Sequence, residues 1–149
     1  MRITSSGLLR TASVVTALFA LGHSSGYPWT PGATAAAQAV ARDMQRVTFE
    51  AEGALCSYWN FYLGFGLIVS CGLASVALML WWLAPLARKL PRDAAPFIGI
   101  ALAFMTANSW LSFRYFFLIP GLFSVVACAL LISALLVARS EWRAASGQA

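Results

Sequence analysis

The chain has 149 residues, of which 60% are hydrophobic and only 10% are charged, and its formal net charge is +5. This composition lies outside the range of ordinary soluble domains and predicts an integral membrane protein. The basic residues occur in ones, twos and threes beside apolar segments, not in a stripe interleaved with aromatic residues. They therefore indicate orientation in a membrane and argue against a nucleic-acid partner.

The first apolar segment covers about residues 8–22 and follows the basic residue Arg2. Its length also fits a cleaved signal peptide, with Ala20 near the point of cleavage, but it lacks a clear A-x-A site. We expect an uncleaved first helix, because the other three spans alone would form an odd bundle that packs poorly.

An outer loop is predicted for residues 23–57. It opens with the polar stretch "HSSGYPWTPG", whose prolines and glycines exclude a continued helix. Within it, residues 33–47 place Ala37, Val40, Met44 and Val47 at helical spacing, with polar residues around the rest of the turn. This pattern predicts a short amphipathic helix that lies on the membrane or caps the bundle.

Three further spans are predicted, at about 59–83, 97–113 and 120–138. The second contains "LIVSCGLASVALMLWWLAPL", and we expect Pro85 to end its helix. The stretch "ARKLPRDAAP" then predicts a tight basic loop. The remaining residues, 139–149, predict a polar and frayed cytoplasmic tail.

Lys and Arg are divided unequally between the two sides of this arrangement. The N-terminal region, the loop between the second and third spans, and the tail carry two, three and two of them, a total of seven, against three on the other side. Because cytoplasmic segments are enriched in Lys and Arg, both termini are expected to face the cytoplasm.

Small side chains that let helix backbones approach recur at intervals of four residues. Gly66, Ser70 and Ala74 mark the second span in this way. A second series, Gly99, Ala103 and Ala107, marks the third span. We expect these two faces to pack against each other as antiparallel neighbours.

Groups that carry chemistry are scarce. No Asp or Glu lies in a predicted span, His23 is the single histidine, and the three cysteines form no C-x-x-C pair. Multi-histidine metal sites and thiol redox centres are therefore disfavoured, and neither a metal nor a cofactor is predicted. No nucleophile and base occur at motif spacing, and no catalytic residue is assigned.

The tentative ligand-binding residues are His23, Asn60, Tyr62 and Arg114, which the predicted topology places at the outer ends of three spans. Each has a structural alternative. His23 can cap the end of the first helix, Arg114 can reach lipid headgroups or stack on aromatic rings, and the aromatics of "SYWNFYLGFGL" can form an interfacial belt.

Gly22-His23, "SYWNFYLGFGL" and "RYFFLIPG" together resemble an uncharacterised family of small four-helix bacterial inner-membrane proteins, over nearly the whole chain. The family pattern has Asp or Asn at the position of Asn60. The resemblance implies a multi-pass protein of the bacterial inner membrane and carries no established activity.

The sequence thus predicts an all-α fold, a single integral membrane domain with a four-helix bundle and a short extracytoplasmic amphipathic helix. The expected function is non-catalytic binding of a lipophilic ligand or a membrane protein partner. Membrane lipid is expected to surround the protein, and the partner can be a second copy of the chain in a homo-oligomer. The alternatives are an enzyme acting on a lipid-like or quinone-like substrate, or a small transporter.

Overall fold

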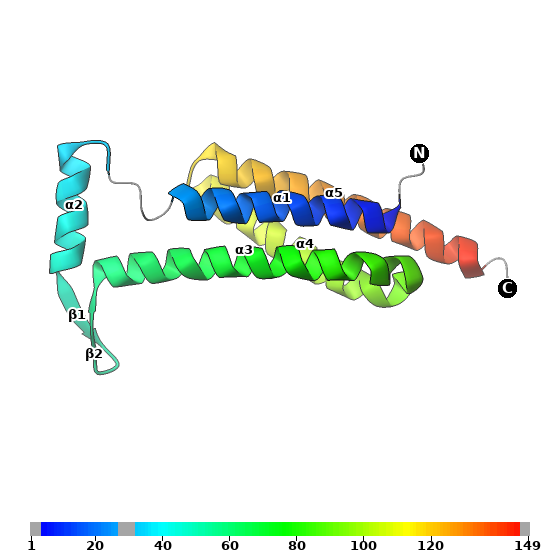
Figure 1. Ribbon diagram of the computed structural model, residues 1–149, viewed down its shortest axis with the longest axis horizontal. Coiled ribbons are helices and arrows are strands. Elements are labelled where there is room, and N and C mark those ends of the chain that lie inside the picture. The colour runs from blue at the N-terminus through cyan, green and yellow to red at the C-terminus, as the bar shows by residue number, and fades with distance from the viewer. Residues whose placement is uncertain (1–3, 27–31, 147–149) are drawn as a thin grey trace. The chain divides into compact units, whose positions relative to one another are not determined.

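The structure is a computed structural model that describes residues 4–26 and 32–146. Of the five helices in these residues, four are long and apolar enough to cross a membrane, which confirms the prediction of a helical fold with four such segments. The elements in chain order (Figure 1) are α1 (Ser5–Gly26), α2 (Ala35–Arg46), β1 (Thr48–Ala51), β2 (Ala54–Ser57), α3 (Tyr58–Lys89), α4 (Pro91–Tyr115) and α5 (Leu118–Ser146).

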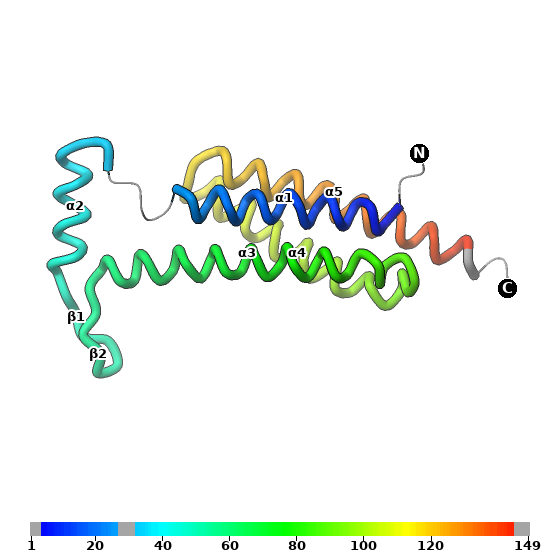
Figure 2. Tube along the Cα trace, in the orientation of Figure 1, coloured from blue at the N-terminus to red at the C-terminus, as the bar shows by residue number. Residues whose placement is uncertain are grey.

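The chain divides into two compact units. Unit 1 consists of Met1–Phe19 and Leu73–Ala149, and unit 2 consists of Ala20–Gly72. The division falls within two helices, which can be followed by residue number along the trace in Figure 2. By their residue ranges, α1 begins in unit 1 and ends in unit 2, whereas α3 begins in unit 2 and ends in unit 1. The two units are described separately below.

The core of unit 1 is built mainly from buried residues that recur at alternating intervals of four and three along each long helix, with one step of seven between Met105 and Ser112 in α4. This spacing keeps one seam of an α-helix facing its neighbours, as in coiled coils and helical bundles. Large and small side chains alternate along much of it, which allows close packing. The series are Ser5, Leu9, Ala12, Thr16 and Phe19 in α1; Leu73, Ala77, Leu80, Ala84 and Ala87 in α3; Ala94, Ile98, Ala101, Met105 and Ser112 in α4; and Ser124, Ala127, Leu131, Ala134 and Ala138 in α5.

Contacts between helices of unit 1 show which of them pack together. The Ser13 hydroxyl of α1 donates to the carbonyl oxygen of Ala77 in α3 at 2.7 Å. Phe19 stacks on Phe123 of α5, with 5.5 Å between ring centroids. Consequently α1 contacts both α3 and α5, while α4 packs along α5 as its antiparallel neighbour.

One end of unit 1 gathers the first turn of α1, the last turns of α3 and α5, and the first turn of α4. Only Leu90 separates α3 from α4, with a non-helical backbone (φ −133°, ψ 67°). The Glu141 carboxylate of α5 accepts hydrogen bonds from the backbone N–H of Ser5, at 3.3 Å, and from its hydroxyl. A side chain of α5 therefore caps the N-terminus of α1, whose unpaired N–H groups favour a negative charge.

Two expectations about helix ends in unit 1 are wrong. Pro85 does not end α3, which continues to Lys89, and the expected basic loop shrinks to Leu90. Ala84 and Ala87 continue the buried seam across the proline, so packing compensates for the hydrogen bond that proline removes. The tail is not frayed from residue 139, because α5 extends to Ser146. Residues 147–149 lie outside the described residues.

The small-residue series expected to join the second and third spans do not form the core of the chain. Ala74, Ala103 and Ala107 are exposed, whereas Ala94 and Ala101 are buried. The physical reason is helical geometry. Each step of four residues turns by roughly 40° beyond a full circle, so a repeat of four drifts around the helix, whereas alternating steps of four and three stay on one seam.

Unit 2 contains the predicted amphipathic helix, confirmed as α2, whose N-cap is Thr34. The Thr34 hydroxyl accepts a hydrogen bond from the backbone N–H of Ala37 at 3.2 Å. The first long helix does not end at Gly22 as expected but at Gly26. Ser24 and Ser25 extend it by donating their hydroxyls to carbonyls of the preceding turn. The rest of the predicted proline loop, residues 27–31, lies outside the described residues.

The cap on α1 yields a stability prediction. Glu141→Ala should lower the free energy of unfolding by about 1–2 kcal/mol, because the buried Ser5 N–H and hydroxyl lose their acceptor. The measurement is unfolding of the purified protein in mixed detergent, followed by circular dichroism. Glu50→Ala in β1 serves as the matched control and should leave the midpoint unchanged. Equal midpoints for Glu141→Ala and wild type would contradict the capping role.

Candidate functional site

A β-hairpin precedes α3 and was not predicted. β1 and β2 pair antiparallel with Thr48 opposite Ser57 and Ala51 opposite Ala54. The turn consists of Glu52 (φ 52°) and Gly53 (φ 79°), both in the left-handed region, as in a two-residue type I′ turn. The signal in the sequence was a pair of short runs, "TFEA" and "ALCS", separated by two residues that end in glycine.

The hairpin is attached to α3 through aromatic rings. The Phe49 ring of β1 lies 4.9 Å from the Tyr58 ring and 5.0 Å from the Phe61 ring, and Phe61 in turn lies 5.9 Å from Phe65. We call Phe49, Tyr58, Phe61 and Phe65 the aromatic cluster. Three aromatics of "SYWNFYLGFGL", Tyr58, Phe61 and Phe65, therefore contact the hairpin or one another.

Ser57 provides the N-terminal cap of α3. Its hydroxyl accepts a hydrogen bond from the backbone N–H of Asn60 at 3.1 Å, and the Tyr58 N–H donates to the Val47 carbonyl at 3.4 Å. Only the backbone of Asn60 takes part in this cap, and its side chain is exposed. The amide of Asn60 is therefore placed on the surface of unit 2 without a structural role in the cap.

Aromatic side chains of the motif, both inside and outside the aromatic cluster, expose large surfaces. Tyr62 is 45% exposed, and its ring lies 5.6 Å from the ring of Trp59, one turn earlier on α3. Tyr58 is 53% exposed and Phe65 is 62% exposed. Exposed aromatic surface of this extent at the start of a long apolar helix is typical of a membrane interface or of a binding surface.

A groove runs between α2 and the start of α3. Its volume is about 250 Å³, below the range of about 300–1,000 Å³ that is usual for small-molecule pockets. None of the residues of α2 is buried, and the exposed fractions of Val40 and Val47 are 59% and 46%. The apolar side of this helix is therefore accessible. The groove is lined by Val40, Asp43, Met44, Val47 and Tyr58.

His23, near the end of α1, forms a hydrogen bond across to α3. Its Nδ1 lies 3.1 Å from the Ser70 hydroxyl oxygen, and the Ser24 hydroxyl lies 3.0 Å from the same atom. Ser70 follows Asn60 by ten residues, or about 15 Å of helix. The structure thus brings His23 to Ser70. The point on α3 that His23 contacts lies about three turns from Asn60.

Arg114 belongs to unit 1, in the last turn of α4, whereas the other three predicted ligand-binding residues belong to unit 2. Its side chain is exposed, and its Cζ atom lies 5.2 Å from the centroid of the adjacent Tyr115 ring. This contact fits the interpretation of an arginine that stacks on aromatic rings near a membrane surface. The convergence of the four residues stays a prediction.

Groups for redox or metal chemistry are dispersed. Across residues 4–26 and 32–146, no three side chains of His, Cys, Asp or Glu are close enough to hold a metal ion. The cysteines are free thiols, and Cys128 lies 3.6 Å from the hydroxyl of Thr106 at the contact between α4 and α5. Nearby, the Asn108 amide donates to the Ser124 hydroxyl at 2.8 Å, which assigns these polar groups to helix packing.

Comparison of the chain with protein-family models, curated proteins and solved structures finds no match. The resemblance to small four-helix inner-membrane proteins therefore stays a prediction from the motifs.

The cap of α3 separates a structural residue from a candidate binding residue. Ser57→Ala should destabilise the start of α3 by about 1 kcal/mol, because the Asn60 N–H loses its acceptor. Asn60→Ala retains that hydrogen bond and should change stability by less than about 0.5 kcal/mol, as exposed substitutions usually do. Amide hydrogen exchange over the first two turns of α3 measures both effects. Faster exchange in Asn60→Ala than in Ser57→Ala would reverse the assignment.

Proposed function

We propose that α1, α3, α4 and α5 form a membrane-spanning four-helix bundle in the bacterial inner membrane, with both termini in the cytoplasm. Their lengths and apolar composition support the spanning arrangement. The motif resemblance supports the bacterial inner membrane. Residues 32–57 then lie on the outer side.

The distribution of charge in unit 1 supports this orientation. One end of unit 1 contains Leu90 and Glu141. The last turns of α3 and α5 and the first turn of α4 carry five basic residues and two acidic residues at this end. Arg114 is at the other end of α4. An excess of Lys and Arg marks the cytoplasmic side. The five cations are Arg88, Lys89, Arg92, Arg139 and Arg143.

Reporter fusions test the orientation. A fluorescent protein fused after Ala149 should be bright in a bacterial host, and alkaline phosphatase at the same site should be inactive, because that enzyme folds only outside the cytoplasm. Phosphatase inserted between Glu52 and Gly53 should be active. The inverse pattern at the two sites would reject the orientation.

Within this membrane protein, we propose a non-catalytic binding function at unit 2, in which the α2 groove and the start of α3 dock a membrane protein partner. The observation that carries the proposal is that α2 is amphipathic but has no buried residue. The groove is shallow and small for a lipophilic molecule, which favours a protein side chain or helix as its occupant. Asn60 and Tyr62 are the expected polar contacts, with His23 and Arg114 as further candidates.

Site-specific photocrosslinking in living cells tests the docking. A photoreactive phenylalanine at Val40, in the groove, should yield a discrete protein adduct. Asn60→Ala with Tyr62→Ala should reduce its yield at least about fivefold, since truncating a tyrosine that anchors an interface costs about 2 kcal/mol or more. The matched control is Leu78, which is 63% exposed on α3 outside unit 2.

The possible outcomes are distinct. An adduct at twice the mass of the chain identifies a second copy as the partner. Equal protein adducts from Val40 and Leu78 would contradict a specific docking surface. A lipophile that copurifies in native mass spectra and is lost with Asn60→Ala and Tyr62→Ala, with no protein adduct from Val40, would replace the protein partner by a ligand.

A further inference from the structure

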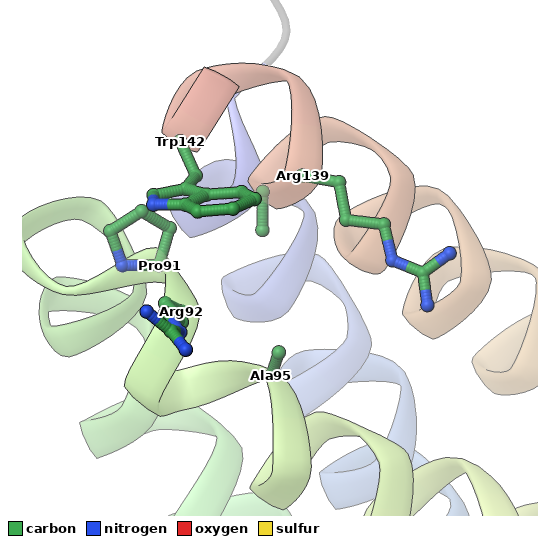
Figure 3. A pocket seen from close by; sticks show the side chains of 6 residues that line it. Pro91, Arg92, Ala95, Arg139 and Trp142 are labelled. Atoms are coloured by element: carbon green, nitrogen blue, oxygen red, sulfur yellow. The ribbon is translucent and has the colours of Figure 1, made fainter. Parts of the chain in front are cut away.

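A second cleft lies in unit 1, between the first turns of α4 and the last turns of α5 (Figure 3). Its volume is about 190 Å³. It is separate from the groove of unit 2 and contains none of the residues discussed there. The cleft, called here the α4–α5 cleft, is lined by Pro91, Arg92, Ala95, Ala138, Arg139 and Trp142.

The walls of the cleft combine apolar and cationic groups. Figure 3 shows the Trp142 indole beside the Pro91 ring, with Arg92 beneath them and the Arg139 side chain extending away from these three residues. The Arg92 Cζ atom lies 5.8 Å from the centroid of the Trp142 ring. Ala138 is buried and forms part of the apolar floor. An apolar floor with cations at its edges suits an amphipathic anion.

The two arginines are not neutralised by acids. Among the residues that the structure describes, neither guanidinium forms an ion pair with a carboxylate. Glu141, the acid nearest in sequence to Arg139, accepts hydrogen bonds from Ser5. The first turn of α4 adds its own partial positive charge, and the N-cap residue Leu90 provides no side-chain hydrogen bond to it. Asp93, which does not line the cleft, partly offsets this charge from the same turn.

We propose that the α4–α5 cleft binds the phosphate of an anionic membrane phospholipid, with Arg92 and Arg139 on either side of it and Trp142 against the glycerol. Basic pockets between spanning helices on the cytoplasmic side are suited to such headgroups. The cleft holds a headgroup and not a whole lipid. Large apolar side chains exposed farther along the helices, Phe97 on α4 and Leu136 on α5, offer surface to the acyl chains.

This inference rests on the proposed membrane placement but not on partner docking by unit 2. Its test is native mass spectrometry of the full chain in mild detergent, titrated with phosphatidylglycerol or, as the neutral comparison, phosphatidylcholine. Phosphatidylglycerol should bind more tightly. Arg92→Gln with Arg139→Gln should weaken it by at least about tenfold, because each arginine near an anionic headgroup contributes on the order of fivefold.

The matched control removes the same charge from the same end of unit 1. Arg88→Gln with Lys89→Gln, which do not line the cleft, should change the affinity for phosphatidylglycerol by less than about threefold. Equal weakening by the two pairs would overturn the proposal, because it would assign binding to diffuse surface charge.

A second pair of variants tests the cleft without changing charge. Ala95→Leu fills the cleft and should weaken phosphatidylglycerol binding, whereas Ala107→Leu, at an exposed position farther along α4, should not. Unchanged binding in Ala95→Leu overturns the site even if the arginine variants fail to fold. Displacement of the lipid by inorganic phosphate, but not by chloride at equal ionic strength, would assign the cleft to a free anion instead.

Discussion

The alternation of buried residues at intervals of four and three along α1, α3, α4 and α5 is the constraint on which the rest of unit 1 depends. Lipid tails are as apolar as leucine side chains, so spanning helices gain little from hydrophobic burial and must associate through close packing. The alanines in this seam allow that approach. The seam also explains why α3 continues beyond Pro85 and why α5 remains packed as far as Ala138.

Polar side chains in the long helices mainly form hydrogen bonds within a helix or between neighbouring helices. Thr16, Thr106 and Ser133 donate to carbonyls one turn earlier in their own helix, and Ser13 donates across to α3. His23 is likewise engaged with Ser70. Such bonds satisfy each hydroxyl without water, as a lipid environment requires. The proposed binding surfaces accordingly lie at the ends of the helices, where exposed aromatic and cationic side chains are found.

The sequence allowed the long helices and α2 to be predicted because run length and helical spacing are local signals. Hydropathy does not distinguish a lipid-facing side from a packed one, so the small-residue faces were misassigned. The cap of α1 by Glu141 joins residues 136 positions apart and has no local signature. The hairpin did have one, in Glu52-Gly53 between two short runs. Of the candidate site, the exposure of Asn60 and Tyr62 was predictable, but the pairing of His23 with Ser70 was not.

The single-residue joint at Leu90 has a consequence for biogenesis. In the proposed membrane placement, α3 and α4 enter the bilayer as one hairpin because a single residue joins them, and the joint carries Arg88, Lys89, Arg92 and Asp93 with it. Moving a charge against a membrane potential of 100 mV costs about 2.3 kcal/mol. Asp93 offsets one of the three cations, so carrying the joint across at its net charge of +2 costs about 5 kcal/mol before any cost of dehydration. In the proposed orientation, the membrane potential therefore opposes translocation of the joint and keeps α3 and α4 from inserting with the opposite orientation.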